Sequence, residues 1–428
     1  MNKVSVIIPI YNASNYLPTT MECLLKQTYS DYEIVAVNDN STDDSLNILK
    51  IYQGLFKKNN NDFIIINRKQ NGGLSAAINS GIRNSTGDYY CFPDADDEMA
   101  TDYISSMMDV LLADNNHKWV RCDYSIVLEE EEREYDVILP SSSVYKDDFY
   151  DFVSKYIAHN AWNMIVERRY FEQCVGNEIY DSRLTQEWSL LLPLSYYSNY
   201  ARCHRKLYKY HIRKKAMSSW QNDILLNVIE HIDGLELLNK NVLNNLEKNV
   251  NERINVGKTA VEIYYHLFRY KKYKEYSMME NAQNELNELL KKSDLYIKKE
   301  ICNKIDNPDM YLRLVFDVLM SGKVDVSLDN YEKYKCITSK SFGIVYDSGG
   351  RDLINAVMVI YGQPKYITEY NEYDEEKMGS IPIIGLIQNS SKYNSFKNKL
   401  FAKNIICLEY RNVRDSIRGW GYKYLERL

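Results

Sequence analysis

The chain has 428 residues, 45% of them hydrophobic, and a formal net charge of -6 from 53 basic and 59 acidic side chains. This length allows two or three globular domains with a substantial core. The balanced charge argues against a nucleic-acid surface, so an anionic ligand needs local basic side chains. The eight cysteines lack CxxC spacing and mostly sit in apolar runs, which indicates buried free thiols in a reducing cytoplasm.

No apolar stretch is long enough to predict a membrane span. The apolar run from Val4 to Ile10 is too short for a signal sequence and is followed at once by polar residues. We therefore expect a cytoplasmic protein, with association at the inner face of the membrane left open.

Strand and helix signals alternate over the first hundred residues. VSVIIPIY is a continuous apolar run, as in a strand buried on both faces, and Leu17 to Gln27 has helical spacing. The following segments are strand-like YEIVAVND, helical STDDSLNILKIYQGLF, strand-like DFIIINR, helical GLSAAINSGIRNS and strand-like GDYYCFPD. This order predicts an α/β fold with a doubly wound, mostly parallel sheet.

Polar residues close each of these predicted strands. They are Tyr11 and Asn12, Asp39, Arg68 and Lys69, and Asp94 to Asp97. Ligands of doubly wound sheets bind beyond the carboxyl ends of the strands, so we expect these side chains to line one crevice.

Asp94-Ala95-Asp96 is an Asp-x-Asp arrangement at a strand end. On extended backbone the two outer carboxylates lie on one side, about 6 to 7 Å apart. That spacing suits a hard divalent cation whose shell is completed by water and phosphate oxygens. The alternative is a turn whose aspartates cap the following helix.

Other strand-end residues also have two interpretations. Asp39 suits a base N–H or a ribose hydroxyl, or it caps the helix that begins at Ser41 to Asp44. The sequence Asn71-Gly72-Gly73 allows close backbone approach to a phosphate at a helix start, or is an ordinary turn. Arg68 and Lys69 either bind the negatively charged diphosphate of a ligand or are simply solvated.

The chain resembles the family 2 glycosyltransferases, which are inverting nucleotide-sugar enzymes with the GT-A fold. The segments that carry the resemblance are VSVIIPIYN, VNDNSTDDS, NGGLSAAINSG and GDYYCFPDADDE. The resemblance implies a Mn2+ or Mg2+ cofactor and a UDP-sugar donor. It places the nucleotide base and ribose at Pro9, Tyr11, Asn12 and Asp39, and the metal and diphosphate at Asp94, Ala95 and Asp96. Arg68, Asn71 and Gly72, whose side chains or backbone suit phosphate, are expected as further donor contacts. One departure is Ile78, where the family usually carries Arg.

The resemblance also suggests a catalytic base. The family places its base in a Glu-Asp pair that is often followed by Trp, and this chain reads SRLTQEWSLLLPL. Matching the Trp puts Glu187 at the base position, whereas another register puts Trp188 there and leaves no base. The alternative role for Glu187 is a helix N-terminal residue favoured by the dipole.

A further segment, LYKYHIRKKAMSSW, resembles the family's Tyr-x-Tyr-Arg region. This resemblance implies that His211 is a metal or diphosphate ligand and that Arg213, Lys214 and Lys215 lie near phosphate charge. The alternative is that the segment is a basic strand on the protein surface.

Three domains are expected. They are a GT-A domain at 1–219, a helical domain at 220–335 where apolar residues recur at helical spacing, and a small α/β module at 336–428. EEEERE at 129–134 is typical of a solvated turn. The C-terminal module is expected to serve assembly or acceptor docking, because DSGG does not match a dinucleotide fingerprint.

The predicted function is an inverting, metal-assisted transfer of a sugar from a nucleotide donor to an acceptor hydroxyl. The resemblance implies a carbohydrate or lipid-linked acceptor in surface polysaccharide or glycoconjugate synthesis. It leaves homo-oligomerisation open. The alternative is a catalytically weakened sugar-nucleotide-binding or scaffold protein, which Ile78 and the two registers of the base motivate.

Overall fold

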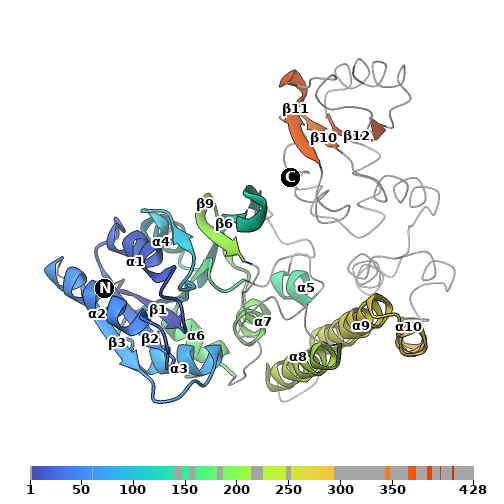
Figure 1. Cartoon of the computed structure of the whole chain (residues 1–428), viewed down its shortest axis with the longest axis horizontal. Coiled ribbons are helices and arrows are strands. Elements are labelled where there is room, and N and C mark those ends of the chain that lie inside the picture. The colour runs from blue at the N-terminus through green and yellow to red at the C-terminus, as the bar shows by residue number, and fades with distance from the viewer. Residues whose placement is uncertain are drawn as a thin grey trace. The chain divides into compact units, whose positions relative to one another are not determined.

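The computed structural model describes a defined part of the chain (Figure 1). The described residues are 2–59, 61–137, 139, 147–153, 160–180, 187–213, 225–246, 252–293, 343–347, 365–372, 383–387, 396 and 407–408. The chain divides into two compact units. One comprises Met1–Leu139 with Lys146–Asn287, and the other comprises Pro140–Tyr145 with Glu288–Leu428.

Nine strands among the described residues form one mixed sheet in the first unit. They are β1 (Val4–Ile10), β2 (Tyr32–Asn38), β3 (Asp62–Asn67), β4 (Tyr89–Cys91), β5 (Glu98–Met99), β6 (Trp119–Leu128), β7 (Arg133–Val137), β8 (Met164–Glu167) and β9 (Ala201–Ile212). Their order is β3-β2-β1-β4-β8-β6-β9-β5, with β7 paired to β6. The pairs among β1 to β4 are all parallel, whereas β8 is antiparallel to both neighbours. The predicted α/β fold is confirmed, and its purely parallel part is β1 to β4.

Ten α-helices occur in the described ranges. They are α1 (Leu17–Leu25), α2 (Ser45–Lys58), α3 (Leu74–Asn84), α4 (Tyr103–Leu112), α5 (Asp148–Val153), α6 (Arg168–Cys174), α7 (Glu187–Tyr197), α8 (Leu225–Leu246), α9 (Glu252–Glu275) and α10 (Met279–Ser293). None of these described helices combines the length and apolarity needed to span a bilayer. The helices α8 and α9 lie in the same compact unit as the sheet. Residues 294–335 of the predicted helical domain lie outside the described residues.

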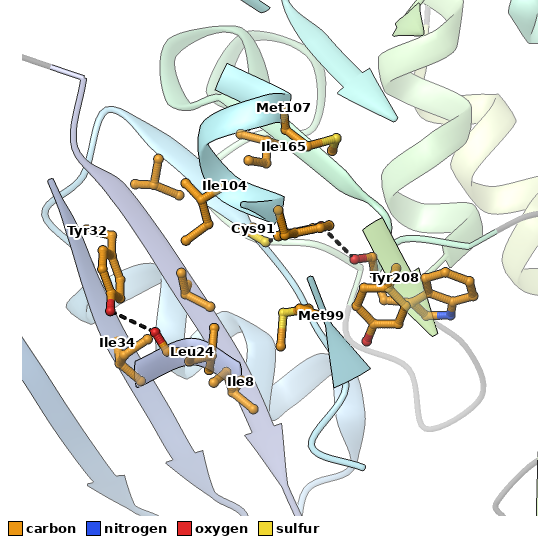
Figure 2. Close-up of a cluster of buried hydrophobic side chains, with 14 of the residues drawn as sticks. Ile8, Leu24, Tyr32, Ile34, Cys91, Met99, Ile104, Met107, Ile165 and Tyr208 are labelled. Carbon is orange, nitrogen blue, oxygen red and sulfur yellow. Dashed lines mark hydrogen bonds between the residues drawn. The ribbon is translucent and has the colours of Figure 1, made fainter. Parts of the chain in front are cut away.

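Helices cover both faces of the parallel strands. On one face, Ile8 of β1, Leu24 of α1 and Met107 of α4 belong to one fully buried apolar cluster (Figure 2). On the other face, α3 approaches so closely that a Cβ at Gly81 would lie 2.3 Å from Cγ2 of Ile7 in β1. With both faces covered, the carboxyl ends of the strands are where a ligand can approach the sheet.

The second unit contains a smaller parallel sheet. Its strands are β10 (Gly343–Tyr346), β11 (Tyr366–Glu369), β12 (Ile383–Leu386) and β13 (Cys407–Leu408), in the order β11-β10-β12-β13. The segments IPIIGLIQN and NIICLEY are strand-like in sequence, and β12 and β13 lie in them. The segments RDLINAVMVIYG and YNSFKNKLFAK are helical in sequence, and they lie outside the described residues apart from Phe396.

Glu33 is a buried carboxylate at the start of β2, at the end of the sheet opposite the strand ends that carry the site. Ser5 Oγ donates to its Oε1 at 2.6 Å, Thr86 Oγ1 donates to its Oε2 at 2.6 Å, and Lys3 Nζ lies 2.9 Å from Oε2. Burial alone would raise the pKa of Glu33, but the hydrogen bonds from Ser5 and Thr86 and the Lys3 ammonium lower it to about 2. Glu33 therefore ties β1, β2 and the loop before β4 together.

Glu33→Gln is expected to lower the free energy of unfolding by about 3 kcal/mol at neutral pH, since the pKa falls from 4.5 to about 2. Because the folded-state pKa is depressed, the contribution is complete above pH 4.5 and is lost as pH falls through about 2. Urea unfolding from pH 7 to pH 3 should therefore show the difference from wild type shrinking. Glu22, which pairs with Lys26 and has 44% of its side chain exposed, provides the control Glu22→Gln. A difference that stays constant with pH would contradict the prediction.

Candidate functional site

The predicted strand-end residues lie along one edge of the sheet. The strands β3, β2, β1 and β4 are parallel neighbours, so the residues after Ile10, Asn38, Asn67 and Cys91 follow one another along that edge. The predicted convergence of the strand ends is thus present in the backbone arrangement.

The loops after β1 and β2 brace each other. Asn12 has a φ of 51°, a left-handed conformation that Asn tolerates. Its Oδ1 accepts the Thr42 N–H at 2.8 Å, and its own N–H donates to Ser41 Oγ at 3.0 Å. Tyr11 is 53% exposed. Of the predicted base-binding residues, Asn12 is thus engaged in shaping the loop, and Tyr11 presents its side chain to solvent.

Asp39 closes the N-terminal end of α3. It is 3% exposed, and its carboxylate accepts Arg68 Nη1 at 2.7 Å, the Gly72 N–H at 3.1 Å and the Gly73 N–H at 2.8 Å. Gly73 has a φ of 86°, which favours glycine. The N-cap of the helix after Ser41 is Asp44 instead, so the capping role weighed for Asp39 is not the one observed.

This arrangement changes the interpretation of the Asn71-Gly72-Gly73 turn. The backbone N–H groups of Gly72 and Gly73 donate to the Asp39 carboxylate, so they are not free to bind a phosphate. Asn71 Oδ1 accepts the Gly73 N–H at 3.1 Å. Arg68 is 21% exposed in its side chain and is paired with Asp39, so it is neither simply solvated nor an unpaired cation.

The Asp94–Asp97 turn is held from two sides. The hydroxyl of the buried Thr20 in α1 lies 3.0 Å from the carbonyl oxygen of Ala95 and 2.8 Å from that of Asp97. On the other side, the Asp94 N–H donates to Tyr208 Oη in β9 at 3.0 Å. Neither Thr20 nor Tyr208 was identified from the sequence, because nothing in their local sequence signals a partner so distant.

Asp97 points inward. It is 1% exposed, Tyr208 Oη donates to its Oδ2 at 3.0 Å, and the His211 N–H donates to its Oδ1 at 2.9 Å. Burial, and then the charge of Asp96, raise the pKa of Asp97 to about 8. Asp97 therefore fastens β9 to the strand-end turn.

Asp94, Asp96 and Glu187 form the acidic part of the site. Burial raises the pKa of Asp94 well above its ordinary value, and the charges of Asp97, Asp96 and Glu187 raise it further. Burial also raises the pKa of Asp96, against the lowering effect of Arg213. Glu187 is the half-buried first residue of α7, and Trp188 next to it is buried. Glu187 thus lies within electrostatic reach of the strand-end carboxylates.

His211 and Arg213 meet further carboxylates at the end of β9. His211 Nε2 lies 3.1 Å from Glu98 Oε1, and His211 Nδ1 lies 3.0 Å from Glu129 Oε1. Arg213 Nη1 donates to Asp96 Oδ2 at 2.8 Å. Lys214 and Lys215, which the sequence places near phosphate charge, lie outside the described residues.

Glu129 corrects the prediction that EEEERE is only a solvated turn. It lies in the turn between β6 and β7, and its Oε1 contacts His211 and, at 2.9 Å, Arg213 Nη2. The sequence did contain a signal for this contact, namely opposite charge. The acidic block follows β6, and β6 pairs with the basic strand β9.

The described residues contain no group of three or more His, Cys, Asp or Glu side chains arranged to hold a metal. Asp94, Asp96 and His211 are therefore not a preformed three-ligand set. The ring nitrogens of His211 face Glu98 and Glu129, and Asp96 contacts Arg213. A cation at this edge would need oxygen ligands from a substrate in addition to Asp94 and Asp96.

Part of the chain is similar to known glycosyltransferases. Residues 5–172 match the family model described as Glycosyl transferase family 2. Glycosyltransferase GlyA of Streptococcus pneumoniae is 33% identical over 232 residues, which are 51% of this chain and 32% of that protein. The uncharacterized glycosyltransferase YibD of Escherichia coli is 41% identical over 114 residues, 27% of this chain and 32% of that protein. The chain thus spans about a third of the length of these relatives. A crystal structure of S. aureus TarS 1-349 in complex with UDP-GlcNAc has 15% identity and a TM-score of 0.48, covering 76% of this chain and 83% of that chain.

Proposed function

From the premise that residues 5–172 belong to glycosyl transferase family 2, we propose that this chain is an inverting glycosyltransferase. It moves a sugar from a nucleotide donor, a UDP-sugar, to an acceptor hydroxyl. The acceptor is a carbohydrate or a lipid-linked precursor of a surface polysaccharide or glycoconjugate, as the family resemblance implies. The observation that carries the proposal is the position of Asp94 and Asp96 directly after β4, on the edge where the parallel strands β1 to β4 end.

Asp94 and Asp96 would hold Mn2+ or Mg2+. Hard cations prefer carboxylate oxygens, and Mg2+ is often held by one or two carboxylates together with substrate phosphates. The pKa of Asp94, raised by burial and neighbouring carboxylates, supports this fit, because a cation would relieve that repulsion. When bound, the cation offsets the charge of the leaving diphosphate. His211 is left out of the proposed ligands, since Glu98 and Glu129 face its ring nitrogens.

Glu187 is the proposed general base. The acceptor oxygen forms a bond to the anomeric carbon while the bond from that carbon to the diphosphate oxygen breaks. The carboxylate of Glu187 takes the hydroxyl proton, and the nucleoside diphosphate leaves with the electron pair. A single displacement inverts the anomeric centre. The position of Glu187 at the half-buried start of α7, within reach of the Asp94 charge, supports this role.

A sugar-nucleotide-binding or scaffold protein is the second candidate. Two observations favour it. Arg213 forms an ion pair with Asp96, a proposed ligand of the cation. Ile78 is buried in α3 at the position where the family usually carries Arg.

Donor turnover separates the two candidates. The full chain is incubated with a panel of UDP- and GDP-sugars in Mn2+, in Mg2+ and in chelator, and released nucleotide is measured. A glycosyltransferase should hydrolyse at least one donor slowly, and only with a cation. Calorimetric binding of a donor without any turnover, with acceptors present, would favour the scaffold. No binding of any donor would contradict both candidates.

A further inference from the structure

The guanidinium of Arg213 is enclosed by three separate segments of the chain. Nη1 donates to Asp96 Oδ2 at 2.8 Å, Nη2 donates to the Asp96 carbonyl oxygen at 2.9 Å, and Nη2 lies 2.9 Å from Glu129 Oε1. The ring of Tyr16 lies 4.0 Å from the guanidinium carbon. The Arg213 side chain is 11% exposed. A positive charge is thus held where the proposed cation ligand Asp96 lies.

One donor of this guanidinium is left unsatisfied. Arg213 Nε is buried and has no hydrogen-bond partner among the described residues. A buried donor without an acceptor is costly, so an additional acceptor near Nε would stabilise this arrangement. The Nε atoms of Arg202 and Arg253 are in the same state, so the contacts with Asp96 and Glu129 are what single out Arg213.

The contacts of Arg213 also conflict with those of a cation. Asp96 Oδ2 is the oxygen that Arg213 holds, and a divalent cation bound to that oxygen would repel the guanidinium next to it. Arginine recognises phosphate oxygens with the same planar donor geometry that it uses for carboxylates. A diphosphate arriving with the cation would give the displaced guanidinium a new anionic partner.

We propose that Arg213 is the resident counter-ion of Asp96, and that it exchanges from Asp96 and Glu129 to the donor diphosphate when the divalent cation binds. This inference rests on the proposed function, since it takes its cation and diphosphate from that reaction. Arg213 is then a positioning residue: it neutralises the turn in the empty protein and contacts the diphosphate in the loaded one. The ring face of Tyr16 supports the guanidinium without competing for the carboxylates.

If Arg213 exchanges between Asp96 and the diphosphate, its removal should strengthen Mn2+ binding and weaken UDP binding. Arg213→Met should bind Mn2+ alone about tenfold more tightly than wild type, because one charge-assisted interaction with Asp96 no longer competes. At saturating Mn2+, the same variant should bind UDP about tenfold more weakly, because it lacks the phosphate contact. Isothermal titration calorimetry on the full chain gives the UDP affinity, and the Mn2+ electron paramagnetic resonance signal gives free metal. Arg213→Lys should fall between wild type and Arg213→Met in both.

Matched variants separate exchange from a structural defect. Arg205 lies on the same strand and pairs with Asp102 at 2.6 Å, so Arg205→Met should change neither affinity. Tyr16→Leu keeps all charges and removes the ring contact, so it should tighten Mn2+ binding by about threefold. Thermal melts of each variant report on folding.

The outcomes distinguish failure of the exchange from failure of the proposed function. Equal Mn2+ affinities in wild type, Arg213→Met and Tyr16→Leu would overturn the exchange and leave the glycosyltransferase proposal standing. Loss of both Mn2+ and UDP affinity in Arg213→Met, at unchanged melting temperature, would also overturn it. If wild type binds no Mn2+ even with UDP, the metal-assisted function fails, and the exchange fails with it.

Discussion

Asp96→Asn is expected to reduce metal-dependent donor turnover to below about one-hundredth of wild type, because metal stabilisation of a leaving group contributes several kcal/mol. The fold should survive. Asp96 lies in a turn with 38% of its side chain exposed, and Asn retains an oxygen that can accept from Arg213. Released UDP is measured with Mn2+ and with chelator, alongside a thermal melt.

Asp109→Asn is the matched control for that variant. Asp109 is an exposed residue of α4, away from the strand-end turn in sequence, and its substitution should leave turnover unchanged. Wild-type turnover that persists in chelator, or full turnover by Asp96→Asn, would contradict a cation at this edge. A melting temperature lowered only in Asp96→Asn would assign the loss to folding instead.

Glu187→Gln is expected to lower sugar transfer by about 10² to 10⁴, the usual contribution of a positioned general base. Gln keeps the size and hydrogen-bonding ability of the side chain but cannot take the proton. Donor binding should persist, because Glu187 is not among the residues proposed to hold the donor or the cation. Transfer rate and UDP affinity are measured on the same preparation.

Glu172→Gln serves as the control for this second variant, since Glu172 pairs with Arg168 in α6. Transfer retained by Glu187→Gln would favour the register that puts Trp188 at the base position. Glu98, which is 41% exposed in its side chain, would then be the better remaining carboxylate. Asp97 is a poor alternative, because its two oxygens accept from Tyr208 and the His211 backbone.

The parallel half of the fold could be predicted from the sequence. A strand buried on both faces reads as a mostly apolar run, and β1 and β2 have this form apart from polar residues such as Ser5 and Glu33. The rest of the sheet, which mixes parallel and antiparallel pairs, could not be predicted, because β6 carries the buried charged residues Arg121 and Asp123 within its apolar run. The basic strand β9 resembles a surface strand for the same reason, although residues such as Tyr208 are buried.

The position of the candidate site was predictable, but its contacts were not. Strand-end residues are local features, and topology places them on one edge. The partners of Asp39, Asp96 and Asp97 lie tens to more than a hundred residues away, as in the Asp96 to Arg213 pair, which spans 117 positions. Such pairing depends on the register of β9 against β6, which local propensity does not specify. The metal ligands, the base and the donor identity therefore stay predictions.

The bond between Tyr208 and Asp97 joins residues 111 positions apart, and this separation matters during synthesis. At ribosomal speeds, the strand-end turn exists for roughly 5 to 20 s before Tyr208 is made. The four parallel strands can pair during that interval, while the acidic turn remains hydrated and without its β9 partners. The edge that carries the candidate site is therefore the last part of the sheet to be completed. A nascent chain arrested before β9 should accordingly hold paired parallel strands whose acidic turn lacks both the Tyr208 bond and the Arg213 counter-ion.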